Sequence, residues 1–176
     1  MPRCLTLIAV VVAAPVLATL ANGCAPERAA NPSPSTGDVV MGLSAEVTAV
    51  VDGDTIDVRV ASGPERVRII GIDTPEIGRN GAADECYAQE AREYVNDALY
   101  GRIVELYPDP TQDDVDRYGR LLRHVLVDGR SIAESALAAG MGYEYTCDAP
   151  YGGQDVHKAA QEAAAAAGAG LWSACE

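Results

Sequence analysis

Three strand-like segments separated only by tight turns follow one another early in the chain. Residues 44–51 (SAEVTAVV), 55–60 (TIDVRV) and 65–72 (ERVRIIGI) carry apolar side chains at about every second position, which is the period of a β-strand. The Asp-Gly and Ser-Gly-Pro sequences between them are typical of turns. Because no helix separates these strands, the pattern predicts an antiparallel meander and excludes βαβ units from this part of the chain.

The rest of the chain alternates helices with further strands. Between residues 91 and 99, apolar side chains recur at i, i+3, i+4, i+7 and i+8, which predicts an amphipathic helix that ends before Gly101. Strands are predicted at 103–107 and 121–127, and helices at 131–139 and 154–167. We therefore predict an α+β fold: a five-stranded, closed β-barrel of the oligonucleotide-binding (OB) type with three packed helices.

The N-terminus has the pattern of an export signal. Residues 5–21 form an apolar run that Pro15 interrupts and that Arg3 precedes, and this run is slightly short for a membrane span. It ends in residues 20–24 (LANGC), which resemble a bacterial lipobox, so we expect cleavage before Cys24 and a lipid on Cys24. The alternatives are cleavage to a free secreted protein and an uncleaved anchor.

This pattern divides the chain into three parts. We expect residues 1–23 to be the signal peptide and residues 24–42 to be the lipidated cysteine and a flexible linker rich in Ala, Pro, Ser and Gly. Residues 43–176 are expected to form the folded domain, exported to the outer face of the membrane as a cell-envelope lipoprotein or secreted. No coiled-coil or repeat pattern is present, so we expect a monomer.

The net charge limits the classes of function that are possible, and the cysteine content limits the number of disulfides. The formal net charge is −13, and loss of residues 1–23 removes one arginine and no acid, which makes it −14. A basic arm or a positively charged groove is therefore excluded as the main source of activity. After export, Cys86, Cys147 and Cys175 remain in an oxidising compartment, which allows one disulfide and leaves one thiol.

Three short segments concentrate polar side chains at predicted turns: DGDT at 52–55, the sequence from Arg68 to Glu76 (RIIGIDTPE), and DRYGR at 116–120. Each has a structural interpretation of its own. The first is a hairpin turn, the second a helix-capping box from Asp73 to Glu76 with Arg68 facing solvent, and the third a polar turn with an exposed ion pair. Together they supply the carboxylates that a hard cation such as Ca²⁺ requires and the arginines that bind phosphate oxygens, which indicates phosphoryl transfer.

The segments VVDGDTIDV, VRIIGIDTPE, CYAQEAREYV, DRYGR and GLWS, in this order and spacing, resemble the staphylococcal nuclease (thermonuclease) family over residues 43–176. The resemblance implies a five-stranded OB barrel with three helices. It also implies Ca²⁺-dependent hydrolysis of DNA or RNA phosphodiester bonds.

The resemblance also implies roles for individual residues. Ca²⁺ would be bound by the carboxylates of Asp54 and Asp73 and the main-chain carbonyl of Thr74. Glu76 would orient or deprotonate the attacking water, while Arg68 and Arg120 would clamp the scissile phosphate. Tyr118 and Tyr145 would contact nucleotide phosphates, and Tyr143 would lie against the base. We expect the Asp54, Asp73 and Glu76 carboxylates to converge on one point, and Asp52 to order its turn.

Exported relatives carry a cysteine before the first helix and another just after the LWS sequence. This resemblance implies a Cys86–Cys175 disulfide, and Cys86–Cys147 is the alternative.

One segment departs from the family pattern. Residues 77–85 (IGRNGAADE) carry one arginine and two acids, where well-known members are rich in lysine. Together with the negative charge, this predicts weak, salt-sensitive substrate binding that depends on Ca²⁺, and a preference for single strands that stack on tyrosines. The alternatives are a non-catalytic OB module that binds nucleic acid or another anion, and a calcium-stabilised structural lipoprotein. All the predicted polar site residues are present, which favours the nuclease.

Overall fold

The computed structural model describes residues 42–147 and 149–175, so the predicted signal peptide, Cys24 and nearly all of the linker lie outside the described residues. The strands are β1 (Leu43–Val50), β2 (Thr55–Val60), β3 (Gly63–Ile69), β4 (Gly71–Asp73), β5 (Ile103–Tyr107), β6 (Leu121–Val127), β7 (Arg130–Ser131) and β8 (Tyr143–Tyr145). The helices are α1 (Ala88–Leu99), α2 (Ile132–Ala138), α3 (Gln154–Ala167) and the short α4 (Leu171–Ala174).

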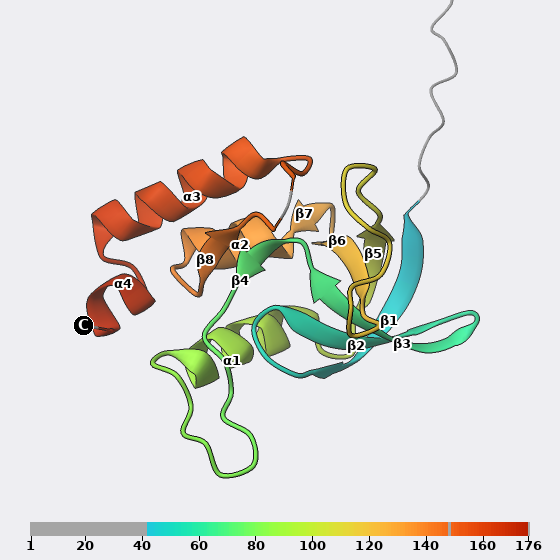
Figure 1. The fold of residues 1–176 in the computed structure, drawn as a ribbon, viewed down its shortest axis with the longest axis horizontal. Coiled ribbons are helices and arrows are strands. Elements are labelled where there is room, and N and C mark those ends of the chain that lie inside the picture. Colours follow the sequence, from blue (N-terminus) through green and yellow to red (C-terminus); the bar gives the residue numbers. More distant parts are fainter. Residues whose placement is uncertain (1–41, 148, 176) are drawn as a thin grey trace, which may run out of the picture. The chain divides into compact units, whose positions relative to one another are not determined.

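Five of the strands close into a barrel, as predicted. The hydrogen-bonded order is β3-β2-β1-β5-β6, and a parallel pairing between β3 and β6 completes the circle. The first three strands form the expected antiparallel meander, since β2 pairs with both β1 and β3. The small strands β4 and β8 pair with each other in a separate two-stranded sheet (Figure 1).

The prediction of one continuous strand over residues 65–72 is wrong, because the chain bends at Gly71. This residue has a φ of 87°, which L side chains rarely adopt. A Cβ atom here would also collide with the imidazole of His157 and the ring of Tyr151. The bend ends β3 and starts β4, and it directs the polar sequence from Asp73 to Glu76 out of the barrel wall.

The core is aliphatic and lies between the barrel strands and two helices. Ala88, Ala91, Val95 and Leu99 form the buried stripe of α1, close to the pattern expected from the sequence. Helix α2 packs between the barrel and α3 (Figure 1). None of the helices among the described residues is both long and apolar enough to cross a membrane.

A disulfide joins Cys86, just before α1, to Cys175, just after α4, as the resemblance implied. Its closed loop spans a sequence separation of 89 residues. The bond therefore connects the end of the loop that follows Glu76 to the C-terminal helix. Cys147 is exposed and is not part of this disulfide.

Candidate active site

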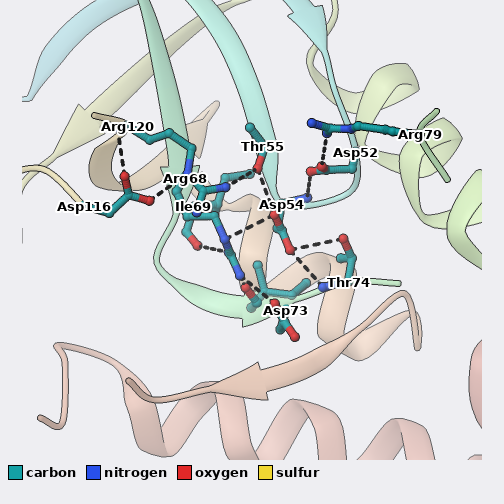
Figure 2. Close-up of polar contacts among 11 residues, drawn as sticks. Asp52, Asp54, Thr55, Arg68, Ile69, Asp73, Thr74, Arg79, Asp116 and Arg120 are labelled. Carbon is teal, nitrogen blue, oxygen red and sulfur yellow. Dashed lines mark hydrogen bonds and ion pairs between the residues drawn. The ribbon is translucent and has the colours of Figure 1, made fainter. Parts of the chain in front are cut away.

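Strand pairing brings the three polar segments together around Asp54. Thr55 in β2 lies opposite Arg68 in β3, and Arg68 lies opposite Leu122 in β6, shortly after the DRYGR sequence. Figure 2 shows Asp54, Thr55 and Arg68 at the centre of a polar network, with Arg120 on one side and Arg79 on the other. Segments far apart in the sequence thus form one continuous cluster.

Asp54 is the hub of this cluster and is only 2% exposed. Its Oδ1 accepts a hydrogen bond from the Thr55 hydroxyl (3.0 Å) and lies 3.2 Å from Nε of Arg68. Its Oδ2 accepts hydrogen bonds from the main-chain N–H (2.9 Å) and the hydroxyl (3.2 Å) of Thr74. Both carboxylate oxygens are therefore fixed by the chain itself.

Arg68 does not face solvent, contrary to one interpretation of its segment, since its side chain is 11% exposed. Its Nη2 donates to Asp73 (2.8 Å), while Nη1 donates to the carbonyls of Ile69 (2.8 Å) and Ile72 (2.5 Å). One guanidinium thus joins Asp54 to Asp73 and also holds the bend between β3 and β4.

The second guanidinium, Arg120, approaches the same cluster through Thr55. Its Nη1 donates to the Thr55 hydroxyl (3.3 Å), and its Nε donates to Asp116 (2.7 Å). Burial alone would raise the pKa of Asp116, but hydrogen bonds from the main chain and side chain of Arg120 and from the Tyr118 N–H outweigh it and lower that pKa. The ion pair predicted for this turn is present, but it is mostly buried rather than exposed, since the Arg120 and Asp116 side chains are 26% and 15% exposed. Arg120 therefore points toward Thr55 rather than into solvent.

The acids of the cluster repel one another. Burial, followed by the charges of Asp54 and Glu76, raises the pKa of Asp52 from 3.8 to about 6. Burial raises the pKa of Asp73, and the charge of Asp54 raises it further against the opposing effect of Arg68. Partial desolvation by neighbouring groups and then the charge of Asp54 raise the pKa of the otherwise exposed Glu76, against the opposing charge of Arg79. Such mutual repulsion marks a site with excess negative charge.

Asp52 has the structural role expected of it. It is 3% exposed, and its Oδ1 accepts a hydrogen bond from the Asp54 N–H (3.3 Å), which orders the turn. Its other oxygen lies 3.4 Å from Nη2 of Arg79. Arg79 therefore connects the loop after Glu76 to the turn between β1 and β2.

Glu76 lies in an open loop, so the capping-box interpretation of its segment is wrong. Residues 74–86 contain no helix, and the Glu76 main chain instead pairs with Glu85, with both hydrogen bonds at 3.0 Å. The Glu76 carboxylate is exposed and makes no hydrogen bond or ion pair with any residue that the structure describes. It is thus available to a water molecule or a ligand.

Three tyrosines surround the cluster. Tyr143 and Tyr145 lie on β8 opposite Asp73 and Gly71 of β4, and they are 43% and 46% exposed. The Arg68 guanidinium lies 5.8 Å from the Tyr145 ring centroid, and a hydrogen bond with Cys147 raises the pKa of Tyr145. Tyr118 is largely exposed, with the Arg120 guanidinium 5.4 Å from its ring centroid. The Tyr118 and Tyr145 rings thus lie beside arginines, while the partly exposed Tyr143 ring packs edge-on against Trp172, with 5.3 Å between the ring centroids.

The predicted convergence of three carboxylates is not found. Within residues 42–147 and 149–175, no group of three or more His, Cys, Asp or Glu side chains could hold a metal ion. Asp54 and Asp73 are instead bridged by Arg68. In their chemistry alone, the predicted Ca²⁺ ligands fit a hard divalent cation, because two carboxylates and the Thr74 carbonyl are hard oxygen donors and the charge of Asp54 raises the pKa of Asp73.

Comparison with known proteins assigns the family. The family model for staphylococcal nuclease homologues (SNase) matches residues 66–174. The chain belongs to the staphylococcal nuclease family. The matched region contains Arg68, Asp73, Glu76 and Arg120 and begins after Asp54.

Several known proteins are similar to the chain in sequence. Protein ParB of Escherichia coli is 31% identical over 140 residues, which cover 74% of this chain and 73% of ParB. A thermonuclease of Staphylococcus hyicus is 30% identical over 128 residues, which cover 73% of this chain and 75% of that protein. The SPbeta prophage-derived endonuclease YokF of Bacillus subtilis is 36% identical over 91 residues, but these cover only 52% of this chain and 30% of YokF.

Sequence analysis assigned no role to Arg79, and it named Thr55 only as part of the DGDT sequence. Arg79 is the single arginine in a loop whose other residues are uncharged or acidic, and this contrast could have marked it as a functional residue. Threonine is common in β-strands, so Thr55 did not stand out in the sequence. Its contacts with Asp54 and Arg120 become visible only once the barrel is closed.

Proposed function

We propose that this chain is an exported, Ca²⁺-dependent nuclease that hydrolyses phosphodiester bonds of DNA, RNA or both. The observation that carries the proposal is the chain of polar contacts from Arg120 through the Thr55 hydroxyl and the buried Asp54 carboxylate to Arg68, in which the last contact is an ion pair. The Glu76 carboxylate lies close enough for its charge to raise the pKa of Asp52. Relatives named thermonuclease and endonuclease support the same class of reaction.

The chemistry follows from the charge of the substrate. A phosphodiester is an anion, so attack by water is slow until positive charge offsets the charge on its oxygens. When bound by Asp54, Asp73 and the Thr74 carbonyl, Ca²⁺ would supply part of that positive charge. Arg68 and Arg120 would donate hydrogen bonds to the phosphate oxygens, where negative charge grows in the transition state.

Glu76 would act as the general base. Its carboxylate is exposed and unpaired among the described residues, and its raised pKa makes it a better proton acceptor than an ordinary glutamate. It would accept a proton from the attacking water. Asp52, whose pKa is raised further, is buried and paired with Arg79, which makes it the weaker candidate.

The exposed tyrosines support single-stranded nucleic acid as the preferred substrate. Bases that are not paired can stack on Tyr143, and Tyr118 and Tyr145 can donate hydrogen bonds to phosphates. Stacking contributes roughly 1–3 kcal/mol per base and needs no basic groove, which suits a chain with a net charge of −13.

A cleavage assay tests the proposal. The purified protein is incubated with single-stranded DNA in Ca²⁺ or in EDTA, beside the variants Glu76→Gln and Arg120→Ala. We expect cleavage only with Ca²⁺ and a rate about 10²–10³ lower in each variant. Arg130→Ala is the matched control, because Arg130 is an exposed arginine on β7, and its rate should match the wild type.

The outcomes separate the candidate functions. Binding of DNA by the wild type without cleavage would replace the nuclease with the non-catalytic OB module. Neither binding nor cleavage would favour the calcium-stabilised structural lipoprotein. Cleavage that is unaffected by EDTA would remove Ca²⁺ from the proposal but keep the nuclease.

We propose further that the protein is anchored by a lipid on Cys24 at the outer face of the membrane. The apolar run 5–21 and the LANGC sequence support this, and the Cys86–Cys175 disulfide is typical of exported proteins. Bacterial cells that express the full chain should incorporate labelled palmitate into it, and Cys24→Ala should not be labelled. Labelling of the variant would refute lipidation at this residue.

A further inference from the structure

Strand β8 carries two of the predicted substrate-binding residues but has little main-chain support. It has three residues, and among the described strands it pairs only with β4, which also has three. An isolated two-stranded pair of this length is marginal in water. The placement of Tyr143 and Tyr145 beside Asp73 must therefore depend on side-chain contacts.

Gln161 on α3 accepts a hydrogen bond from the Glu144 N–H (2.6 Å), and Trp172 packs edge-on against Tyr143. The contact that reaches both strands of the small sheet is made by Tyr151, which is 5% exposed. Its hydroxyl lies 3.0 Å from the Glu144 carboxylate on β8, 3.3 Å from the Gly71 carbonyl on β4 and 3.0 Å from Nδ1 of His157 on α3. One atom thus touches both strands of the small sheet and the helix that packs on them. Glu144 lies between the two tyrosines in sequence, so the pleat directs it away from the face that Tyr143 and Tyr145 share.

The Tyr151 segment is itself fixed to the barrel by Asp109, which is 6% exposed. Oδ2 of Asp109 accepts hydrogen bonds from the Gly152 N–H (2.6 Å) and lies 2.9 Å from Nε2 of His124 on β6. The Thr111 hydroxyl donates to Asp109 (2.6 Å). These contacts hold the main chain next to Tyr151 against the barrel, and the Tyr151 side chain is buried beside them.

We propose that Tyr151 is a positioning residue for substrate binding: its hydroxyl fixes β8 on β4 and so holds Tyr143 and Tyr145 at the site. The inference rests on the proposed nuclease function, which assigns those tyrosines to the substrate. The inference assigns a role to the polar cluster of Tyr151, Glu144 and His157, which takes no part in the proposed catalytic chemistry.

The hydroxyl is needed as well as the ring. A tyrosine hydroxyl has one proton to donate and can accept from another donor, so it can link His157 to Glu144 in one direction. The ring alone packs against Gly71 and lies 5.4 Å, centroid to centroid, from the His157 imidazole. Without the hydroxyl, the Glu144 carboxylate keeps the Thr146 hydroxyl as a partner (2.6 Å) but loses its contact with Tyr151. The Glu144 main chain keeps its hydrogen bond to Gln161 on α3 (2.6 Å) and its pairing with Ile72, so the loss should weaken the position of β8 rather than release the strand.

The test is Tyr151→Phe, which removes the hydroxyl and keeps the ring. Loss of one such hydrogen bond should raise KM for a single-stranded oligonucleotide about threefold to tenfold and leave kcat within about twofold of the wild type. Tyr94→Phe is the matched control, because the Tyr94 hydroxyl also donates to a main-chain carbonyl, that of Ser135 (3.1 Å), between α1 and α2. It should lower the thermal midpoint without changing KM.

Equal KM values in Tyr151→Phe and the wild type would overturn the inference, and so would a KM change of the same size in Tyr94→Phe. If Tyr151→Phe does not fold, Glu144→Ala serves in its place and should raise KM, while Glu144→Gln, which keeps an acceptor oxygen, should stay near the wild type. An unchanged KM in Glu144→Ala would equally refute the role of the hydroxyl contact.

A binding measurement distinguishes failure of this inference from failure of the proposed function. The Kd of a fluorescently labelled single-stranded oligonucleotide is measured by anisotropy in the Glu76→Gln background, where cleavage is slow. We expect Tyr151→Phe to raise this Kd by the same factor as KM. If the wild type neither cleaves nor binds the oligonucleotide, the proposed function fails; if it does and Tyr151→Phe binds equally well, only the inference fails.

Discussion

The Thr55 hydroxyl contacts both a predicted metal ligand and a predicted phosphate ligand, so replacing it separates the two halves of the site. Thr55→Val keeps the shape of the side chain and removes its hydroxyl, which is 3.0 Å from Asp54 and 3.3 Å from Arg120. The residue is 3% exposed, so water does not replace the lost partner freely. A hydrogen bond to a charged group contributes about 1.5–3 kcal/mol.

The rest of the network limits the effect. Asp54 keeps Arg68 and both contacts with Thr74, and Arg120 keeps Asp116. We therefore expect the lower end of the range: the free energy of unfolding falls by about 1–2 kcal/mol, and kcat/KM falls about tenfold because Arg120 is less well oriented. Urea unfolding and a cleavage assay with single-stranded DNA measure the two quantities.

Thr55→Ser is the matched control, since it keeps the hydroxyl and removes only a methyl group. It should cost about 1 kcal/mol of stability for the lost packing and leave kcat/KM within about threefold of the wild type. If Thr55→Val cleaves as fast as the wild type, or if Thr55→Ser loses as much activity as Thr55→Val, the hydroxyl does not orient Arg120.

Three further predictions concern stability. The double variant Cys86→Ser/Cys175→Ser should lose up to about 4–5 kcal/mol of unfolding free energy, the chain-entropy value for this loop length, and an unchanged thermal midpoint would refute it. Because the pKa of Asp52 is raised to about 6, the folded state binds more protons than the unfolded chain between about pH 4 and 6. The ionised Asp52 therefore lowers the free energy of unfolding above about pH 6. In EDTA, the change in unfolding free energy caused by Asp52→Asn should therefore be more stabilising at pH 8 than at pH 4, by roughly 1–3 kcal/mol. Equal changes at the two pH values would contradict this. Gly71→Ala should cost about 2–5 kcal/mol in urea unfolding, whereas Gly81→Ala, with nearly the same φ of 86° but nothing within 4 Å of its Cβ position, should cost about 1–2; equal costs would rule out the collision with His157 and Tyr151.

The barrel was predictable because its signals are local. The alternation in residues 44–60 and the Asp-Gly turn fix the first hairpin, and the helical spacing between residues 91 and 99 fixes the face of α1 that is buried. Errors arose where a distant contact decides the local structure. Gly71 ends β3 because His157 and Tyr151, some eighty residues later in the chain, leave no room for a side chain and hold the bend.

The sequence predicted which residues form the site better than it predicted the contacts among them. The polar segments meet as expected, because strand register places Thr55 opposite Arg68. The sequence did not indicate that Arg68 would bridge Asp54 and Asp73, since a guanidinium with five donors can serve several acceptors at once and its choice depends on which carbonyls the bend presents. Nor did it indicate that Glu76 would lie in an open loop, because DTPE is equally typical of a helix start.

The balance of charge in this cluster explains why metal binding and substrate binding would be coupled in the proposed nuclease. Among the described residues, Arg68 and Arg79 are the arginines that pair with Asp52, Asp54 and Asp73 or oppose the charge of Glu76. Arg120 is paired with Asp116. A phosphate that approaches this site without a cation meets more negative than positive charge, and the surrounding chain offers no basic loop to compensate. In the proposed nuclease, a divalent cation held by Asp54, Asp73 and the Thr74 carbonyl would offset this excess of negative charge, and Arg68 and Arg120 would then donate hydrogen bonds to the phosphate.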